Sequence, residues 1–307
     1  MTHSAVVFPG QGSQSVGMLA EMHAASERVA RTFAEASDAI GRDLWQLASA
    51  GPGEELNQTR WTQPVMLAAD VALWREYRAR GGDIPLALAG HSLGEYAALV
   101  AAGALEFIDA VRVVHARGEL MQQAVAEGEG AMAAILGLDD EVVERICGDT
   151  EGSVVAANYN SPGQVVIAGS RISVEQAVER CRQAGARRAM LLPVSVPAHS
   201  PLMRPAAAGL AAALAEVPIR APQCPVLHNR DLKPHSEPEE IRQALVEQLT
   251  YPVPWTETVR ELRGRGATRF LECGPARVLA GLGRRIDRDA EWIALESPDG
   301  MQQAVAA

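Results

Sequence analysis

The sequence is short of cysteine, of aromatic residues and of long apolar runs, and each shortage narrows the kinds of protein it can be. Of 307 residues four are cysteine, and their wide spacing forms neither a paired metal-ligand pattern nor a dithiol motif. We expect reduced, structural thiols and no metal or other cofactor. Aromatic residues make up only 4% of the chain, but apolar residues reach 48%, as in a globular protein with a sizeable core. The cysteines are Cys147, Cys181, Cys224 and Cys273.

Membrane segments and an excess of basic charge are also lacking. The longest apolar stretches, 97–105 and 130–138, fall well short of the length that spans a bilayer. Residues 1–8 lack the basic region, apolar run and cleavage site of a signal peptide, so we expect a cytoplasmic protein that does not bind membranes. The formal net charge of −10 argues against nucleic acid as a partner, because phosphates require a basic surface. We further expect a monomer.

The first part of the chain alternates apolar strands with amphipathic helices. Residues 4–8 and 84–89 are predicted to be buried strands, each followed by a glycine-containing loop. Helices are predicted over 28–40, 62–80, 93–102 and 108–125. This alternation is typical of an α/β domain with a parallel sheet.

Between residues 127 and 196 the pattern changes to short elements in the order strand, helix, strand, strand, helix, strand. This order is the signature of a ferredoxin-like unit, and a strong turn signal at 159–163 joins its two middle strands. After Pro197 the first pattern resumes. The sequence therefore predicts a discontinuous large domain, 1–126 and 197–307, and an inserted small ferredoxin-like α+β domain, 127–196.

A Gly-x-Ser-x-Gly motif at 90–94 lies between a predicted strand and a predicted helix, which is the context of a nucleophile elbow. The sharp turn brings the backbone on either side of Ser92 together, so the positions two before and two after must be small, as Gly90 and Gly94 are. Ser92 would also lie at a helix N-terminus, where free N–H groups favour developing negative charge. The alternative is a serine that merely caps the helix. The context favours a nucleophile in an α/β-hydrolase-like large domain.

A serine nucleophile needs an adjacent base, most often histidine. His91 is next to Ser92, but neighbouring side chains diverge on such a turn. His199 lies in a loop that returns from the small domain to the large one, just before a predicted helix, and His228 ends a predicted strand; both stay open as the base. The other histidines are less suited, since His3, His23 and His235 lie in polar segments and His115 lies within a predicted helix.

Five motifs occur in an order that matches one known family. They are Phe8-Pro9-Gly10-Gln11-Gly12-Ser13-Gln14, Gly90-His91-Ser92-Leu93-Gly94-Glu95, Arg117-Gly118, Asn160-Ser161-Pro162-Gly163-Gln164 and Val194-Ser195-Val196-Pro197-Ala198-His199. The chain resembles the malonyl-CoA:acyl-carrier-protein transacylases of bacterial type II fatty acid synthesis from Ala5 to about Ile286. Five spaced motifs are far more specific than a serine elbow alone.

The resemblance implies a role for several residues. His199 is then the base, and the backbone carbonyl of Gln248 orients it in place of a triad carboxylate. The N–H groups of Gln11 and Leu93 form the oxyanion hole. From the residues alone, one of the aspartates between Ser92 and His199 stays open as a third triad member.

Arg117 is the candidate for selecting the acyl group. A malonyl group carries a free carboxylate, and the planar fork of an arginine pairs both of its oxygens. An arginine in a helix is more often a solvated surface charge. Only the match to the family's Arg-Gly pair favours a functional role for Arg117.

The loop before His199 bears on the pathway. Polyketide synthase (PKS) domains selective for malonyl usually have His-Ala-Phe-His here, whereas this chain has Val196-Pro197-Ala198-His199 and is similar to the stand-alone fatty-acid enzymes. Those enzymes typically have serine at Ala198 and an apolar residue at Cys273, and neither departure is expected to change specificity.

The activity that the resemblance implies is ping-pong transfer of malonyl from malonyl-CoA, through Ser92, to the phosphopantetheine thiol of acyl carrier protein. Carrier proteins are acidic as a class, so a local basic patch is expected to dock them. Its candidates are Arg187, Arg188, Arg204, Arg277, Arg284 and Arg285. Three alternatives remain: a discrete acyltransferase serving a PKS, an esterase-type hydrolase and a non-catalytic scaffold.

Overall fold

The structure is a computed structural model that describes residues 3–194 and 196–306. Ser195, in the last of the five motifs, lies outside the described residues, as do Met1, Thr2 and Ala307. The strands are β1 (Ser4–Phe8), β2 (Ala87–Gly90), β3 (Gly130–Leu136), β4 (Val154–Ser161), β5 (Gln164–Ser170), β6 (Arg188–Leu191), β7 (Val226–Leu227), β8 (Arg269–Glu272) and β9 (Glu291–Ala294).

Helices lie between all consecutive strands except β4 and β5. They are α1 (Ala20–Ala25), α2 (Glu27–Ile40), α3 (Leu44–Ala50), α4 (Gly53–Leu56), α5 (Thr59–Ala79), α6 (Gly94–Ala101), α7 (Phe107–Gln123), α8 (Asp140–Gly148), α9 (Arg171–Gln183), the 3₁₀ turn η1 (Pro201–Met203), α10 (Arg204–Ala215), α11 (Pro238–Gln248), α12 (Trp255–Gly264), α13 (Val278–Ile286) and α14 (Pro298–Ala306). In the part of the chain described, no helix combines the length and the apolar character that crossing a bilayer requires.

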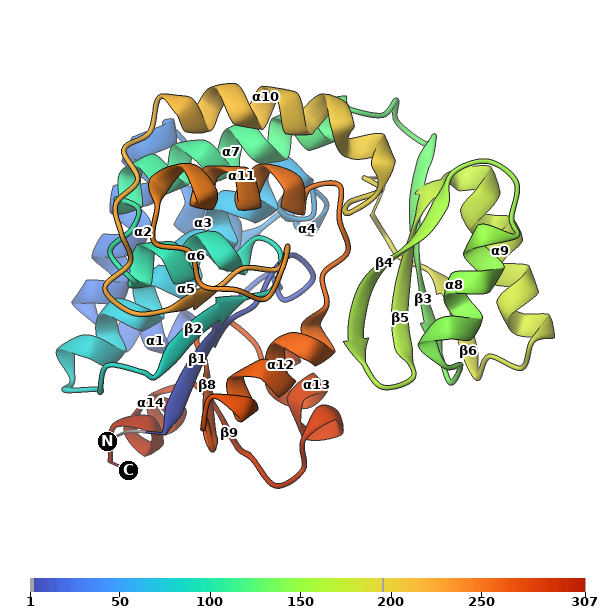
Figure 1. Cartoon of the computed structure of the whole chain (residues 1–307). Coiled ribbons are helices and arrows are strands. Elements are labelled where there is room, and N and C mark those ends of the chain that lie inside the picture. Colours follow the sequence, from blue (N-terminus) through green and yellow to red (C-terminus); the bar gives the residue numbers. More distant parts are fainter. Residues whose placement is uncertain (1–2, 195, 307) are drawn as a thin grey trace.

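The large sheet is parallel and has the strand order β7-β2-β1-β8-β9. Its central strand, β1, is buried along its whole length, which explains why its sequence is a continuous apolar run. Successive side chains point to opposite faces: Val6 and Phe8 join one core cluster, and Ala5 and Val7 join the other. Figure 1 shows α12 and α13 on one side of this sheet and the larger group of helices, including α6 and α7, on the other.

The strand register brings the two predicted loops together. β1 pairs with β2 so that Phe8 lies opposite Gly90, and both strands end there. Loop 9–14 and the Ser92 turn therefore leave the sheet side by side at its carboxyl edge, where open α/β sheets bind their ligands. This edge faces the small domain in Figure 1.

The small domain contains the antiparallel sheet β4-β5-β3-β6, with α8 and α9 packed on one face. Its element order from β3 to β6 is the predicted strand, helix, strand, strand, helix, strand. We propose the domain boundaries that the sequence predicted, 127 and 196, because β3 begins just after the first and β6 ends just before the second.

The two domains are joined by main-chain hydrogen bonds as well as by the crossing chains. The Val253 N–H donates to the Ala157 carbonyl at 2.9 Å, and the Tyr159 N–H donates to the Val253 carbonyl at 3.0 Å. A segment of the large domain thus extends the sheet of the small one along β4. This pairing supports a fixed position of the two domains relative to each other.

The structure differs from the sequence prediction at several elements. β2 begins at Ala87 rather than at residue 84, and the Ile84 side chain is 65% exposed. Pro85, which has no N–H to donate to a ladder, lies in the predicted part that is not strand. The sequence prediction did not include α1, α3, α4, β9 and α14.

Candidate active site

Ser92 lies in the turn between β2 and α6 with a φ of 52°, a left-handed conformation that non-glycine residues seldom adopt. A Cβ atom at Gly90 would collide with the backbone of Gly94, and one at Gly94 would collide with the carbonyl oxygen of Phe8. The turn therefore requires glycine at both positions, as the motif predicted. The Ser92 N–H donates to Asn229 Oδ1 at 2.8 Å, which helps to hold the strained turn.

His199 approaches Ser92 from the loop between β6 and η1, and it too has a positive φ, 61°. Its Nε2 lies 2.7 Å from Ser92 Oγ, and its Nδ1 lies 2.8 Å from the carbonyl oxygen of Gln248. Because a carbonyl oxygen only accepts, Nδ1 must carry the proton, and Nε2 of the neutral ring is left to accept from the serine hydroxyl. This is the geometry of a nucleophile and its base.

The charge state of His199 follows from its surroundings. Its side chain is buried, and burial, together with the nearby Arg117 cation, lowers its pKa to about 3. The ring is therefore neutral at physiological pH and free to accept a proton. An anion that neutralised Arg117 would raise the pKa of His199, since Arg117 is one of the causes that lower it.

Arg117 extends from α7 into the same site and is only 1% exposed. Its Nη1 donates to Gln63 Oε1 at 2.8 Å, and its Nη2 donates to Gln248 Oε1 at 3.0 Å and to Ser92 Oγ at 3.3 Å. Among the described residues no carboxylate lies within ion-pair distance of it. Burial lowers the pKa of Arg117 from its ordinary value. The guanidinium is thus a buried cation that forms no direct ion pair with a described residue, and its Nη2 lies 3.3 Å from the serine oxygen.

Gly118 explains how α7 comes so close to its neighbour. A Cβ atom there would lie 2.7 Å from Arg60 Cα and 2.7 Å from the Thr59 carbonyl oxygen, so the start of α5 packs directly on the α7 backbone. Glycine at position 118 therefore allows two helices to approach closely. It places Gln63 of α5 within reach of Arg117.

Gln11 and Leu93 line the same cavity as Ser92, and their N–H groups have no acceptor among residues 3–194 and 196–306. The Gln11 side chain is held by Thr59 Oγ1 at 3.3 Å. Two free N–H groups beside a serine oxygen are what a tetrahedral oxyanion needs. The role of Gln11 and Leu93 as the oxyanion hole stays a prediction.

These residues open into one cavity of about 430 Å³ between the two domains. The large domain contributes Ser92, Arg117 and His199. The small domain contributes apolar side chains, among them Met132, Val166 and Leu192, and the amides of Asn158 and Asn160. Serine, base and buried cation thus meet where a ligand can enter.

Comparisons with known proteins show the family of this chain. Residues 5–294 match the family model described as acyl transferase domain. The chain belongs to the acyl transferase family. The malonyl CoA-acyl carrier protein transacylase of Escherichia coli strain K12 is 53% identical over 307 residues, covering 99% of each chain, and that of Bacillus subtilis strain 168 is 42% identical, covering 99% of this chain and 97% of the other.

Solved structures give the same family. The malonyl CoA-acyl carrier protein transacylase of Coxiella burnetii has a TM-score of 0.98 at 48% identity, covering 99% of this chain and 97% of that one. A malonyl-transacylase in complex with a type II PKS acyl-carrier protein has a TM-score of 0.97 at 51% identity, covering 99% of both. Among the acyl transferases, the chain is therefore a member of the malonyl CoA-acyl carrier protein transacylases.

Two other histidines near Ser92, His91 and His228, have partners of their own. His91 Nε2 is 2.9 Å from Asn160 Oδ1 and its ring packs against Trp255, so the side chain points toward the small domain. The possibility that His228 is the base is wrong, because His228 is fully buried with its Nδ1 2.7 Å from Glu95 Oε1. The described residues contain no group of three or more His, Cys, Asp or Glu side chains that could hold a metal ion.

The sequence prediction missed Glu95, Asn229 and Gln63, each of which contacts a site residue or its support. Two of them left a signal. Glu95 is a charged residue in a short helix that is otherwise apolar apart from Tyr96, and Asn229 follows a strand at the carboxyl edge of a parallel sheet. Gln63, in the long helix α5, left none.

The six arginines predicted to dock a carrier protein are all exposed but do not form one cluster. Arg187 and Arg188 lie at β6, one edge of the small sheet, whereas α13 with Arg284 and Arg285 contacts β4 at the other edge. Arg277 forms an ion pair with Glu296, and Arg285 donates to Gln164 Oε1 at 2.8 Å. The single patch that the sequence suggested is therefore split between two sides of the small domain.

Proposed function

We propose that this acyltransferase moves a malonyl group from malonyl-CoA to the phosphopantetheine thiol of acyl carrier protein through a malonyl-Ser92 intermediate. The observation that carries the proposal is Arg117, a buried cation that has no carboxylate at ion-pair distance among the described residues and whose Nη2 lies 3.3 Å from Ser92 Oγ. An unpaired buried charge is costly, and the free carboxylate of a malonyl group on Ser92 would compensate it. An acetyl group would leave it unpaired.

The first half-reaction uses the His199 ring as a proton carrier. Ser92 Oγ attacks the thioester carbonyl carbon while its proton passes to His199 Nε2, and the new oxyanion accepts hydrogen bonds from the Gln11 and Leu93 N–H groups. When the tetrahedral intermediate collapses, the C–S bond breaks and CoA leaves as the thiol with the proton from His199. The malonyl ester on Ser92 remains, and His199 is neutral again.

The second half-reaction repeats these steps with the carrier-protein thiol. His199 removes the thiol proton, sulfur attacks the ester carbonyl, and the same N–H groups hold the oxyanion. Collapse breaks the bond to Ser92 Oγ, which takes the proton back from His199. The Gln248 carbonyl, 2.8 Å from His199 Nδ1, keeps the ring in the tautomer that both halves need.

Fatty acid elongation is the pathway that we propose for this chain. A second candidate is supply of a PKS, because a solved malonyl-transacylase 51% identical to this chain is in complex with a type II PKS acyl-carrier protein. Transfer rates to carrier proteins of the two kinds, measured side by side with one enzyme preparation, separate the candidates. A higher kcat/KM for the fatty-acid carrier protein supports the first.

Intact-mass spectrometry after mixing with acyl-CoA tests the proposal. The wild type should gain one malonyl group, and Ser92→Ala should gain none. Arg117→Ala should lose malonyl labelling rate about 10- to 150-fold, the equivalent of a charge-assisted hydrogen bond, while acetyl labelling changes little. Arg112→Ala is the matched control, because Arg112 lies on the same helix with its side chain 61% exposed.

Two results would contradict the assignment of roles. Malonyl labelling of Ser92→Ala would remove Ser92 as the nucleophile. Equal malonyl and acetyl labelling of the wild type would remove Arg117 as the group that selects the acyl carboxylate. Rapid release of malonate without an acceptor would indicate hydrolysis, the reaction of an esterase.

Docking of the carrier protein is proposed at α13, through Arg284 and Arg285. Reversing both charges should slow transfer to the carrier protein severalfold at low salt without changing acylation by malonyl-CoA, since steering acts on the encounter of charged surfaces. Reversing Arg187 and Arg188 at the opposite edge is the matched comparison. Equal effects of the two pairs would mean that the carrier protein responds only to overall charge.

We propose that the enzyme is cytoplasmic and monomeric. All four cysteines are buried and free, which suits a reducing compartment. Within a single copy of the chain, Ser92 Oγ already lies in contact with His199 Nε2 and Arg117 Nη2.

A further inference from the structure

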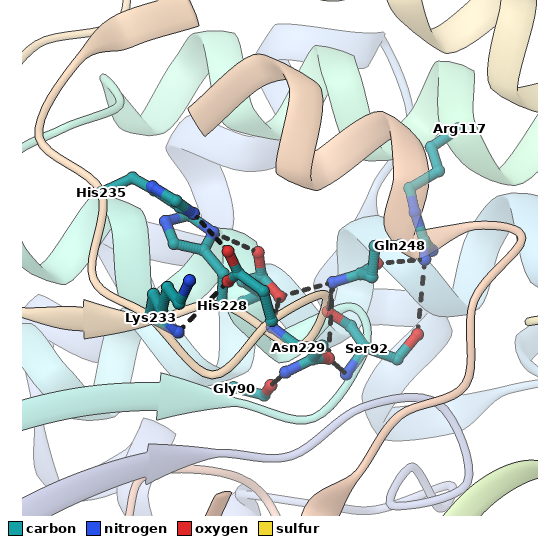
Figure 2. Close-up of polar contacts among 10 residues, drawn as sticks. Gly90, Ser92, Arg117, His228, Asn229, Lys233, His235 and Gln248 are labelled. Carbon is teal, nitrogen blue, oxygen red and sulfur yellow. Dashed lines mark hydrogen bonds and ion pairs between the residues drawn. The ribbon is translucent and has the colours of Figure 1, made fainter. Parts of the chain in front are cut away.

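A layer of buried polar side chains lies directly beneath the Ser92 turn. Glu95 and His228 are 0% exposed, and Asn229 and Gln248 are 1% exposed. Figure 2 shows Gln248 and Asn229 next to Ser92, with contacts that run from His228 through this layer to Arg117. None of these four side chains touches a reacting atom as the acyl group is transferred, yet burying them is costly unless their hydrogen bonds are made.

Glu95 is the acceptor at the centre of this layer. Its Oε1 lies 2.7 Å from His228 Nδ1, and its Oε2 accepts from the Asn229 N–H at 2.9 Å and from Gln248 Nε2 at 2.8 Å. All of these partners are donors to a group that, as a carboxylate, can only accept. Glu95 thereby decides which end of the Gln248 amide faces it.

The orientation of the Gln248 amide follows from its two acceptors. Its Nε2 donates to Glu95 Oε2 and, at 3.0 Å, to the Ser92 carbonyl oxygen. The other end of the amide, Oε1, is then left to accept from Arg117 Nη2 at 3.0 Å. A rotated amide would place oxygen against two acceptors and its NH₂ group against a cation, which are three unfavourable contacts.

Arg117 is held by two amide oxygens of this kind. Gln63 Oε1 accepts from Nη1 at 2.8 Å, and Gln248 Oε1 accepts from Nη2, the nitrogen nearest Ser92 Oγ. No carboxylate competes with them among the residues that the structure describes. Glu95 therefore acts on Arg117 indirectly, because it holds the Gln248 amide and that amide holds the guanidinium.

We infer that Glu95 is a positioning residue that fixes the Gln248 amide, and through it the Arg117 guanidinium, in the place where an acyl carboxylate on Ser92 is bound. The inference rests on the proposed function, since it gives Glu95 a part in preferring malonyl over acetyl. Asn229 is oriented differently: its Oδ1 accepts from the Ser92 N–H, and its Nδ2 donates to the Gly90 carbonyl at 2.7 Å. It supports the turn for any acyl group.

The test measures kcat/KM for Ser92 acylation with malonyl-CoA and with acetyl-CoA, and compares their ratio among variants. Glu95→Met keeps the length of the side chain but removes the acceptor, and the malonyl-to-acetyl ratio should fall about five- to tenfold, the effect of one hydrogen bond. Glu95→Gln should keep the ratio. Its amide nitrogen can turn to His228, whose neutral ring can carry its proton on Nε2, while its oxygen still accepts from Gln248.

His228→Asn is the matched control, because it alters the partner of Glu95 Oε1 and leaves the Gln248 contact on Oε2 in place. It should leave the ratio unchanged. If Glu95→Met does not fold, as judged by thermal unfolding, Gln248→Met removes the contact to Glu95 together with the contact to Arg117 and should lower the ratio at least as much. It retains the backbone carbonyl that His199 uses.

Two outcomes overturn the inference alone and leave the proposed function standing. The first is an equal fall of malonyl and acetyl rates in Glu95→Met or, in its place, Gln248→Met, which is what general loosening of the site would cause. The second is an unchanged ratio in that variant while Arg117→Ala loses the preference, so that only the role of Glu95 fails. An unchanged ratio in Arg117→Ala itself would instead remove the proposed role of Arg117, and the inference with it.

Discussion

The two walls of the cavity carry different kinds of side chain, hydrogen-bonded polar groups in the large domain and mainly apolar groups in the small domain. The large-domain wall carries Ser92, His199 and Arg117, and each of these side chains is held by at least one hydrogen bond to another side chain or to the backbone. The small-domain wall presents Met132 and Val166, members of an apolar cluster that packs against Ala198, the neighbour of His199.

This difference indicates that the large-domain wall makes and breaks bonds, whereas the small-domain wall contributes to the shape of the binding site. Hydrogen bonds hold atoms to a few tenths of an ångström and in one direction, as proton transfer requires. Apolar contacts are weakly directional and tolerate changes of shape. We therefore expect substitutions in the large-domain wall to lower the rate of bond making, and substitutions in the small-domain wall to alter binding.

The largest expected effect in this comparison is that of His199→Ala. Loss of the base should slow acylation of Ser92 about 10²- to 10⁴-fold at saturating malonyl-CoA. A time course of intact-mass labelling after rapid quenching measures it. His23→Ala, a histidine stacked on Trp45 outside the cavity, is the control. A fall of less than tenfold in His199→Ala would mean that the large-domain wall has another base.

The pH dependence of acylation is the next test, because it reports the charge of His199 in the large-domain wall. His199 must be neutral to accept a proton, and its pKa of about 3 keeps it neutral as the pH falls from 8 to 5. kcat/KM for malonyl-CoA should therefore stay level over this range. A histidine with an ordinary pKa would be charged at pH 5 and would lose about thirtyfold.

A descending acid limb between pH 6 and 7 would contradict the burial of His199 in the free enzyme. In Arg117→Ala the limb should move to higher pH than in the wild type, since the Arg117 cation is one cause of the lowered pKa. A limb that moved to lower pH would show that the two groups do not interact as their positions indicate.

The smallest expected effect belongs to the small-domain wall. Val166→Ala removes two methyl groups from the apolar surface and should raise KM for malonyl-CoA by less than about tenfold, with the saturated acylation rate unchanged. Ile172→Ala, in the same domain but 71% exposed, is the matched control. Steady-state and single-turnover rates separate the two quantities. A large fall in the saturated rate would show that this wall also positions His199.

Much of the fold could be predicted from local pattern. The apolar run of β1, the glycines on either side of Ser92 and the alternation of short elements from β3 to β6 each depend on neighbours in sequence. The short helices α3 and α4 and the edge strand β9 were missed, because their few residues gain stability from packing rather than from a periodic pattern of their own.

The candidate site, like the fold, could be predicted from the sequence only in part. The residue chemistry pointed to Ser92 through a motif of five adjacent residues, whereas His199 and His228 could not be separated by it. Both follow strands and both become buried. Only the folded chain places one beside Ser92 Oγ and the other beside Glu95, at 2.7 Å in each case.

The sequence by itself determined the nucleophile turn, the order of the elements and, through the five motifs, the family. Tertiary structure alone decided that Arg117 is a buried cation, that its two amide partners come from α5 and from the end of α11, and that Glu95 orients one of them. The physical reason is the range of the interactions. Turns and periodic helices depend on residues a few positions apart, whereas these hydrogen bonds join residues 54, 131 and 153 positions apart.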